Sequence, residues 1–125
     1  MALFWTEWIA LAYSNLELGK RWWIETFDCK EVELPCWDDP LPSDVALTMP
    51  GDDEPAILLR DRMEDPDAGL SPAEHHIIFC SKLKKAQEYL LGRGLTLGPI
   101  QDGGGTYFFE VRDREGNVIE ICEEP

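Results

Sequence analysis

The sequence contains two copies of one pattern, "WIALAYSNLELGKRWW" (Trp8–Trp23) and "HHIIFCSKLKKAQEYL" (His75–Leu90), which align at one constant offset without a gap. Each copy begins with an apolar stretch, passes through a serine (Ser14 or Ser81) and ends in apolar residues at helical spacing. Similarity at a fixed offset indicates one supersecondary unit used twice. The pattern therefore predicts a strand, a junction at the serine and an amphipathic helix in each half of the chain.

Both predicted helices rest on an apolar stripe at the spacing of one helical face. In the first half the stripe consists of Leu16, Gly19, Trp23 and Phe27. In the second half it consists of Leu83, Ala86 and Leu90. Ser14 and Glu17 form the S-x-x-E pattern of a capping box, which predicts the start of the first helix. Trp22 lies beside the stripe and is expected to pack or to serve a dimer contact. Gly92 and Gly94 predict the end of the second helix.

Each predicted helix is followed by three strand candidates separated by turn residues. They lie at about Cys29–Leu34, Val45–Met49, Ala56–Arg60, Leu95–Ile100, Tyr107–Arg112 and Val118–Cys122. The polar segment Asp61–Glu74 is typical of a linker. The predicted fold is α+β, with two βαβββ modules that form a half-barrel bearing a cleft. We expect a single domain over residues 1–125, with module 1 at about 1–62 and module 2 at about 73–125.

Composition excludes some classes of partner. The chain has 25 acidic against 11 basic residues and a net charge of −14, which argues against binding nucleic acid or anionic membranes. No apolar run approaches the roughly 20 residues that span a bilayer. Met1–Tyr13 is apolar but lacks the basic start of a signal peptide, so a first strand is expected there. The four cysteines form no C-x-x-C pair and are expected to be reduced thiols in a cytoplasmic protein.

Strand alternation singles out Glu120 near the end of the chain. In "VIEIC" (Val118–Cys122), Ile119 and Ile121 suit the face beneath a helix, which sends Glu120 and Cys122 to the opposite side. A carboxylate that points inward needs a partner, because burying an unpaired charge is costly. The partner could be a metal ion, a histidine or water. The alternative is a solvated carboxylate on the concave face of the sheet.

In its organisation and in three segments the chain resembles the vicinal oxygen chelate superfamily, which includes glyoxalase I, extradiol dioxygenases, methylmalonyl-CoA epimerase and bleomycin-resistance proteins. The segment "FEVRDREGNVIEI" (Phe109–Ile121) is similar to the family's closing hairpin. The segments "YSNLELGKRWW" (Tyr13–Trp23) and "HHIIFCSKL" (His75–Leu83) resemble its two strand-to-helix junctions. The resemblance covers nearly the whole chain and implies the same two-module fold.

In members of that family that use a metal, the resemblance implies ligands on the first and last strands of each module. Glu120 and His75 match two of these places, with His76 as the alternative to His75 if the strand contains a bulge or slips by one residue. The first module offers Trp8 at the third place and Ile57 or Leu58 at the fourth, and none of these can bind a metal. The resemblance thus implies an incomplete site. At most, a divalent ion (Ni, Fe, Mn or Zn) is expected as cofactor.

Trp8, Ile77 and Phe79 are expected to line a pocket between the modules, with Trp8 as a stacking surface for a flat or cationic ligand. Trp8 could equally fill the space of a lost metal site. The leading hypothesis is a glyoxalase- or bleomycin-resistance-like protein that binds a small molecule and forms a homodimer, as the resemblance implies. The alternative is a metal-dependent lyase, epimerase or dioxygenase with His75 and Glu120 as ligands. No catalytic residue is assigned.

Overall fold

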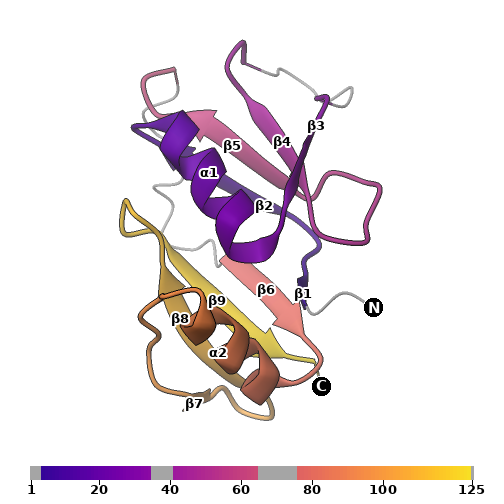
Figure 1. The fold of residues 1–125 in the computed structure, drawn as a ribbon, viewed down its shortest axis with the longest axis vertical. Coiled ribbons are helices and arrows are strands. Elements are labelled where there is room, and N and C mark those ends of the chain that lie inside the picture. The colour runs from indigo at the N-terminus through magenta and orange to yellow at the C-terminus, as the bar shows by residue number, and fades with distance from the viewer. Residues whose placement is uncertain (1–3, 35–40, 65–75, 125) are drawn as a thin grey trace.

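The computed structural model describes residues 4–34, 41–64 and 76–124 (Figure 1). The elements in chain order are β1 (Phe4–Trp5), β2 (Ile9–Tyr13), α1 (Leu16–Phe27), β3 (Lys30–Val32), β4 (Val45–Thr48), β5 (Ile57–Asp61), β6 (His76–Cys80), α2 (Leu83–Gly92), β7 (Gln101–Asp102), β8 (Tyr107–Arg112) and β9 (Val118–Glu123). They form a four-stranded sheet in the order β2-β5-β4-β3 and a five-stranded sheet in the order β1-β6-β9-β8-β7. No helix among these residues is long and apolar enough to cross a membrane.

The repeat predicted from the sequence is present in the structure. β2 begins at Ile9 and β6 at His76, and the same offset separates the start of α1 at Leu16 from that of α2 at Leu83. In each module the first strand pairs in parallel with the last, β2 with β5 and β6 with β9. The α+β fold with two βαβββ modules is therefore confirmed. The half-barrel stays a prediction, because the described strands form two separate sheets.

The apolar N-terminal segment forms two strands rather than the single expected one. β1 pairs antiparallel with β6 of the second module, whereas β2 begins the sheet of the first module. Between them, the Thr6 hydroxyl donates a hydrogen bond of 2.8 Å to the carbonyl oxygen of Ile77. The chain thus crosses from one module to the other over residues 6–8 and ties them together.

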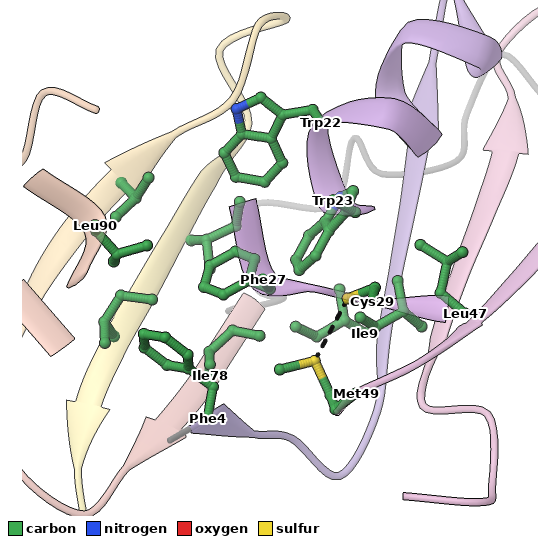
Figure 2. Packing of buried hydrophobic residues seen from close by; sticks show 14 of the residues in the cluster. Phe4, Ile9, Trp22, Trp23, Phe27, Cys29, Leu47, Met49, Ile78 and Leu90 are labelled. Carbon is green, nitrogen blue, oxygen red and sulfur yellow. Dashed lines mark hydrogen bonds between the residues drawn. The ribbon is translucent and has the colours of Figure 1, made fainter. Parts of the chain in front are cut away.

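One hydrophobic core serves both modules. Figure 1 shows α1 lying over the sheet of the first module and α2 over that of the second. The ring of Phe4 makes edge contacts with Phe27 of α1, at 5.1 Å between ring centroids, and with Tyr89 of α2, at 5.5 Å. Figure 2 shows Leu90 of α2 on one side of Phe4 and Phe27 and Leu47 of β4 on the other. The two modules therefore pack through their helices and β1.

The tryptophans of α1 are both inside the chain. Trp23 is fully buried and donates a hydrogen bond of 2.8 Å from Nε1 to the hydroxyl of Tyr13. Trp22 is 8% exposed and makes edge contacts with Trp23 and Phe27. Packing within the chain, rather than a dimer contact, therefore accounts for Trp22.

The predicted capping box at Ser14 and Glu17 is wrong. The N-cap of α1 is Asn15, whose side-chain oxygen accepts a hydrogen bond of 3.2 Å from the backbone N–H of Leu18. Asparagine caps helices as well as serine does. Ser14 donates instead, from its N–H and its hydroxyl, to the carboxylate of Glu115 in the turn between β8 and β9. A partner remote in the sequence thus replaces the local cap.

The second module departs from the expected strand at Leu95–Ile100. Only Leu97 forms an isolated bridge, to Val111, and the pairing resumes at β7. Pro99 interrupts the stretch, because proline has no N–H to donate to a sheet. The end of α2 is as predicted: Gly94 has a φ of +83° and its N–H donates to the carbonyl of Leu91. The predicted linker Asp61–Glu74 overlaps the last residue of β5, and most of it lies outside the described residues.

A polar contact joins the C-terminal ends of the two helices. Asp28, the C-cap of α1, accepts a hydrogen bond of 2.6 Å from the Tyr89 hydroxyl and forms an ion pair of 3.0 Å with Arg93. Arg93 also stacks over the Tyr89 ring at 4.6 Å and donates to the carbonyl of Glu25. The hydrogen bond from Tyr89, together with the charge of Arg93, holds the pKa of Asp28 below its usual value.

Gly19 should be required for the packing of α1 on β2. A Cβ at this position would lie 2.6 Å from Cγ of the Tyr13 ring, which is itself buried in the core. Alanine favours helix by about 1 kcal/mol over glycine, but moving a core ring costs about 1–3 kcal/mol or more. We therefore expect Gly19→Ala to lower the free energy of unfolding, measured by urea denaturation.

Gly92→Ala is the matched control, because it also lies in a helix but a Cβ there would meet nothing within 4 Å. It should leave stability unchanged or raise it. A Gly19→Ala variant as stable as the Gly92→Ala variant would contradict this packing.

Tyr89→Phe should raise the pKa of Asp28 toward its ordinary value of 3.8, because it removes the hydrogen bond that contributes most to the lowering. A carboxyl with a lowered pKa in the folded state stabilises the fold above its ordinary pKa, and this contribution is lost as the pH falls. The stability difference between wild type and Tyr89→Phe should therefore shrink below about pH 4. Carbon-13 NMR titration of the Asp28 carboxyl measures the shift. Tyr107→Phe serves as control, and an unchanged titration in Tyr89→Phe would refute the contact.

Candidate functional site

The sheet of the second module has one face beneath α2 and one face without a helix. Ile78, Ile119 and Ile121 are fully buried on the helix side. Cα pairing places Ile77 opposite Glu120 and Phe79 opposite Cys122 on the other side. We call this side the open face of the second module; its residues on β6, β8 and β9 include Ile77, Phe79, Phe108, Glu110, Glu120 and Cys122. Three predicted site residues, Ile77, Phe79 and Glu120, therefore share one face, and each is half-buried.

Glu110 belongs to the same face and was missed by the sequence analysis. It lies on β8 directly opposite Glu120 on β9. Its neighbours Phe109 and Val111 are fully buried on the helix side, so period-two alternation in "YFFEVR" (Tyr107–Arg112) carries the signal that would have found it. The open face thus presents two carboxylates across one strand pair, where like charges repel.

The question of which histidine faces Glu120 is partly answered. His76 pairs with Ile119, so it lies in the register of the helix side rather than that of Glu120. β6 contains no bulge in this pairing, and the one-residue slip does not occur. The other candidate, His75, lies outside the described residues.

The first module carries apolar residues where the second carries carboxylates. Ile9 pairs with Ile57 as His76 pairs with Ile119, so Leu58 is the counterpart of Glu120. Ala46 lies opposite Leu58, as Glu110 lies opposite Glu120. Leu58 is 8% exposed and Ala46 is buried. Of the two residues proposed for this place from sequence, Leu58 is therefore the one in position.

Trp8 belongs to the first module. It immediately precedes β2 in the first module and is 48% exposed, one of the most exposed large apolar side chains in the described chain. In the aligned repeat it is the counterpart of His75. Neither Trp8 nor Leu58 has a side-chain atom that can bind a divalent ion, so the donor set does not fit a centre with four protein ligands. The described residues contain no group of three or more His, Cys, Asp or Glu arranged to hold a metal.

A charged pair on the first module is satisfied within the chain. Arg60 donates from Nε and from Nη2 to the two carboxylate oxygens of Asp44, at 2.9 and 2.8 Å. Burial acts to raise the pKa of Asp44, but the hydrogen bonds from Arg60 and from the N–H of Leu41 outweigh it and hold that pKa below its usual value. Asp44 is therefore a structural anion rather than a candidate base.

The three cysteine thiols in the described residues are poor nucleophiles. Burial raises the pKa of Cys29 and Cys80 to about 12 each. Burial also raises the pKa of Cys122 on the open face, and the charge of Glu120 adds to this. All three are free thiols, and since the thiolate is the reactive form, a raised pKa disfavours their reaction at neutral pH.

Among the described residues we consider three surface cavities. The largest, about 490 Å³, is lined by Gly94–Gly98, Glu110 and Arg112, so it adjoins the open face through Glu110. A second, of about 280 Å³, is lined by Thr6, Glu7 and the loop from Asp52 to Ala56. A third, of about 210 Å³, lies between α1 and Arg114. Only the first of these three combines a candidate site residue with a volume typical of small-molecule pockets.

Comparison by sequence gives no match: no family model matches the chain, and no curated protein matches it. Solved structures do match. One is a member of the glyoxalase/bleomycin resistance protein/dioxygenase superfamily from Sphaerobacter thermophilus DSM 20745, at 20% identity and a TM-score of 0.71, covering 96% of this chain and 98% of that one. Another is lactoylglutathione lyase from Agrobacterium tumefaciens, at 17% identity and a TM-score of 0.68, covering 94% and 92%.

A third match is TioX from Micromonospora sp. ML1, at 18% identity and a TM-score of 0.63, covering 97% of each chain. Identities this low establish the fold and leave the activity to the residues of the site. The chain has the vicinal oxygen chelate fold, as the resemblance of its sequence implied.

Proposed function

We propose that this protein binds a small molecule over the open face of the second module, where the sequence analysis expected a cleft between the modules, and that its metal site is incomplete. The observation that carries the proposal is the joint position of Ile77, Phe79 and Glu120 on one half-buried face. The counterpart of Glu120 in the first module is Leu58, which supports the loss of the shared metal site.

The open face has the mixed character of a ligand site. Ligand pockets are mostly apolar, with a few polar groups that fix orientation. Trp5 stacks on Phe79 with ring centroids 6.1 Å apart and an interplanar angle of 25°, which widens the apolar surface. Covering such surface stabilises a complex by about 25 cal/mol per Å² of apolar area. Trp8, at 48% exposure, offers a further aromatic surface from the first module.

The carboxylates indicate the sign of charge that the ligand carries. Glu110 and Glu120 lie opposite each other, and the whole chain has a net charge of −14. A positive group on the ligand relieves the repulsion between the two carboxylates, whereas a purely anionic ligand adds to it. One solved structure with this fold is named a glyoxalase/bleomycin resistance protein, which supports a ligand of the cationic antibiotic kind.

A second candidate is a metal-dependent lyase, epimerase or dioxygenase, favoured by the match to lactoylglutathione lyase. His75 and Glu120 would be its protein ligands. A site with two protein ligands is incomplete, so a further ligand would have to come from a neighbouring residue, from the substrate or from a partner subunit. We further propose a homodimer, in which a second copy covers part of the open face, and a cytoplasmic location, in keeping with the free thiols.

Metal binding separates the two candidates. Calorimetric titration of chelator-treated protein with Ni²⁺, Mn²⁺, Fe²⁺ or Zn²⁺ should give no tight stoichiometric binding, because Trp8 and Leu58 supply no donor atoms. Glu120→Ala should therefore behave as wild type does. Stoichiometric binding that Glu120→Ala abolishes would favour the metal-dependent enzyme and overturn the incomplete site.

Aromatic fragments should bind on the open face. In a methyl NMR screen of planar aromatic amines, fragments that bind should shift the methyl signal of Ile77. The Phe79→Ala substitution should lower the affinity of these fragments by about tenfold, because apolar contact is lost. Leu91→Ala is the matched control, because Leu91 is an exposed apolar residue on α2, away from this face. Fragments that leave Ile77 unshifted, or bind Phe79→Ala as well as wild type, would contradict the proposed site.

A further inference from the structure

The largest of the three cavities is lined by two charged residues, Glu110 and Arg112, and the proposed function involves only Glu110. Glu110 and Arg112 stand two residues apart on β8, so both side chains leave the same face of the strand. Their Cα atoms are roughly 7 Å apart at the usual strand rise. Within the described chain, neither side chain forms a hydrogen bond or an ion pair, with each other or with any other residue. Two opposite charges thus face one cavity without neutralising each other.

The remaining wall of the cavity is held against β8 by the backbone. The N–H of Gly98 donates a hydrogen bond of 2.9 Å to the carbonyl oxygen of Glu110, and Leu97 bridges to Val111. Leu97 and Gly98 are therefore held beside β8 next to Glu110. Leu95 and Leu97 pack partly against the core, which gives this wall an apolar part. A wall that is already in position lowers the cost of ordering when a ligand binds.

The two ends of the cavity carry charges of opposite sign. Glu110 gives one end of the cavity a negative charge, and Glu120 lies opposite it on β9, outside the cavity lining. Arg112 lies opposite Val118, so the other end carries a single positive charge with an apolar neighbour. A purely cationic ligand satisfies only the first end, and a purely anionic ligand only the second. Both ends are satisfied by a ligand with an ammonium group and a carboxylate a short distance apart.

We propose that this cavity binds an amino-acid-like zwitterion, with the ammonium group at Glu110 and the carboxylate at Arg112. The guanidinium of Arg112 is suited to bind the carboxylate, because its planar fork can donate two parallel hydrogen bonds to a carboxylate. The apolar part of the ligand lies toward Phe108, which precedes Glu110 by two residues on the same face of β8. The inference rests on the proposed function, because the ligand occupies the same open face and extends it to Arg112.

Three probes of one shape and one neutral analogue test the charge requirement: L-phenylalanine, phenethylamine, 3-phenylpropionate and 2-phenylethanol. Methyl NMR titration gives the affinity of each and reports its place, because the Ile77 methyls lie on the open face and the Leu97 methyls beside the cavity. Wild type should bind phenylalanine roughly tenfold more tightly than either singly charged probe, as expected for one additional charge-assisted hydrogen bond.

Variants then assign each end of the cavity. Arg112→Gln should reduce phenylalanine binding to the level of phenethylamine and leave phenethylamine unchanged. Glu110→Gln should weaken phenethylamine and leave 3-phenylpropionate unweakened. Arg114→Gln is the matched control, because Arg114 is a nearby exposed arginine that does not line this cavity. It should bind all four probes as wild type does.

The outcomes separate this inference from the proposed function. Equal binding of all four probes with shifts at Ile77 would overturn the zwitterion and leave the binding face intact. Unchanged phenylalanine binding in Arg112→Gln would also overturn it. If no probe shifts Ile77 or Leu97, both proposals fail.

Discussion

The position of Phe4 between the two helices is the constraint on which the arrangement of the modules depends. Its ring contacts Phe27 of α1 and Tyr89 of α2, and β1, which carries it, is hydrogen-bonded to β6. Because both helices are buried against this shared core, each sheet has one covered face and one face without a helix. The period-two alternation of a strand then assigns every residue to one face or the other. Hydrophobic packing, rather than any polar contact, thus determines which side chains are available to bind a ligand.

The two modules have kept the fold of one repeat and diverged in chemistry. Glu110 and Glu120 on the second module correspond to Ala46 and Leu58 on the first. Ala46 and Leu58 are buried although no helix covers their face, whereas Glu110 and Glu120 are half-buried. A metal centre shared by the two modules needs donors from both, and the first module has apolar side chains at these two places. The second module retains polar groups that can recognise a ligand by charge.

The sequence predicted what depends on periodicity and missed what depends on distant contacts. The constant offset between the two copies, both helices and the face of Glu120 follow from local patterns. The prediction that Ser14 caps the first helix was wrong because Ser14 donates instead to Glu115, which is remote in the sequence. The prediction of a strand at Leu95–Ile100 was wrong because Pro99 has no N–H to donate to a sheet, although its neighbours are apolar. Glu110 was overlooked although alternation identified its face, since the resemblance implied ligands on the first and last strands of each module and β8 is neither.

The most direct measurement is a crystal structure of the protein grown with a bound aromatic amino acid. The account predicts ligand density against Ile77 and between Glu110 and Arg112, on the open face of the second module. Density against Ala46 and Leu58 instead, on the counterpart face of the first module, would contradict it, because the apolar copy would then be the binding site.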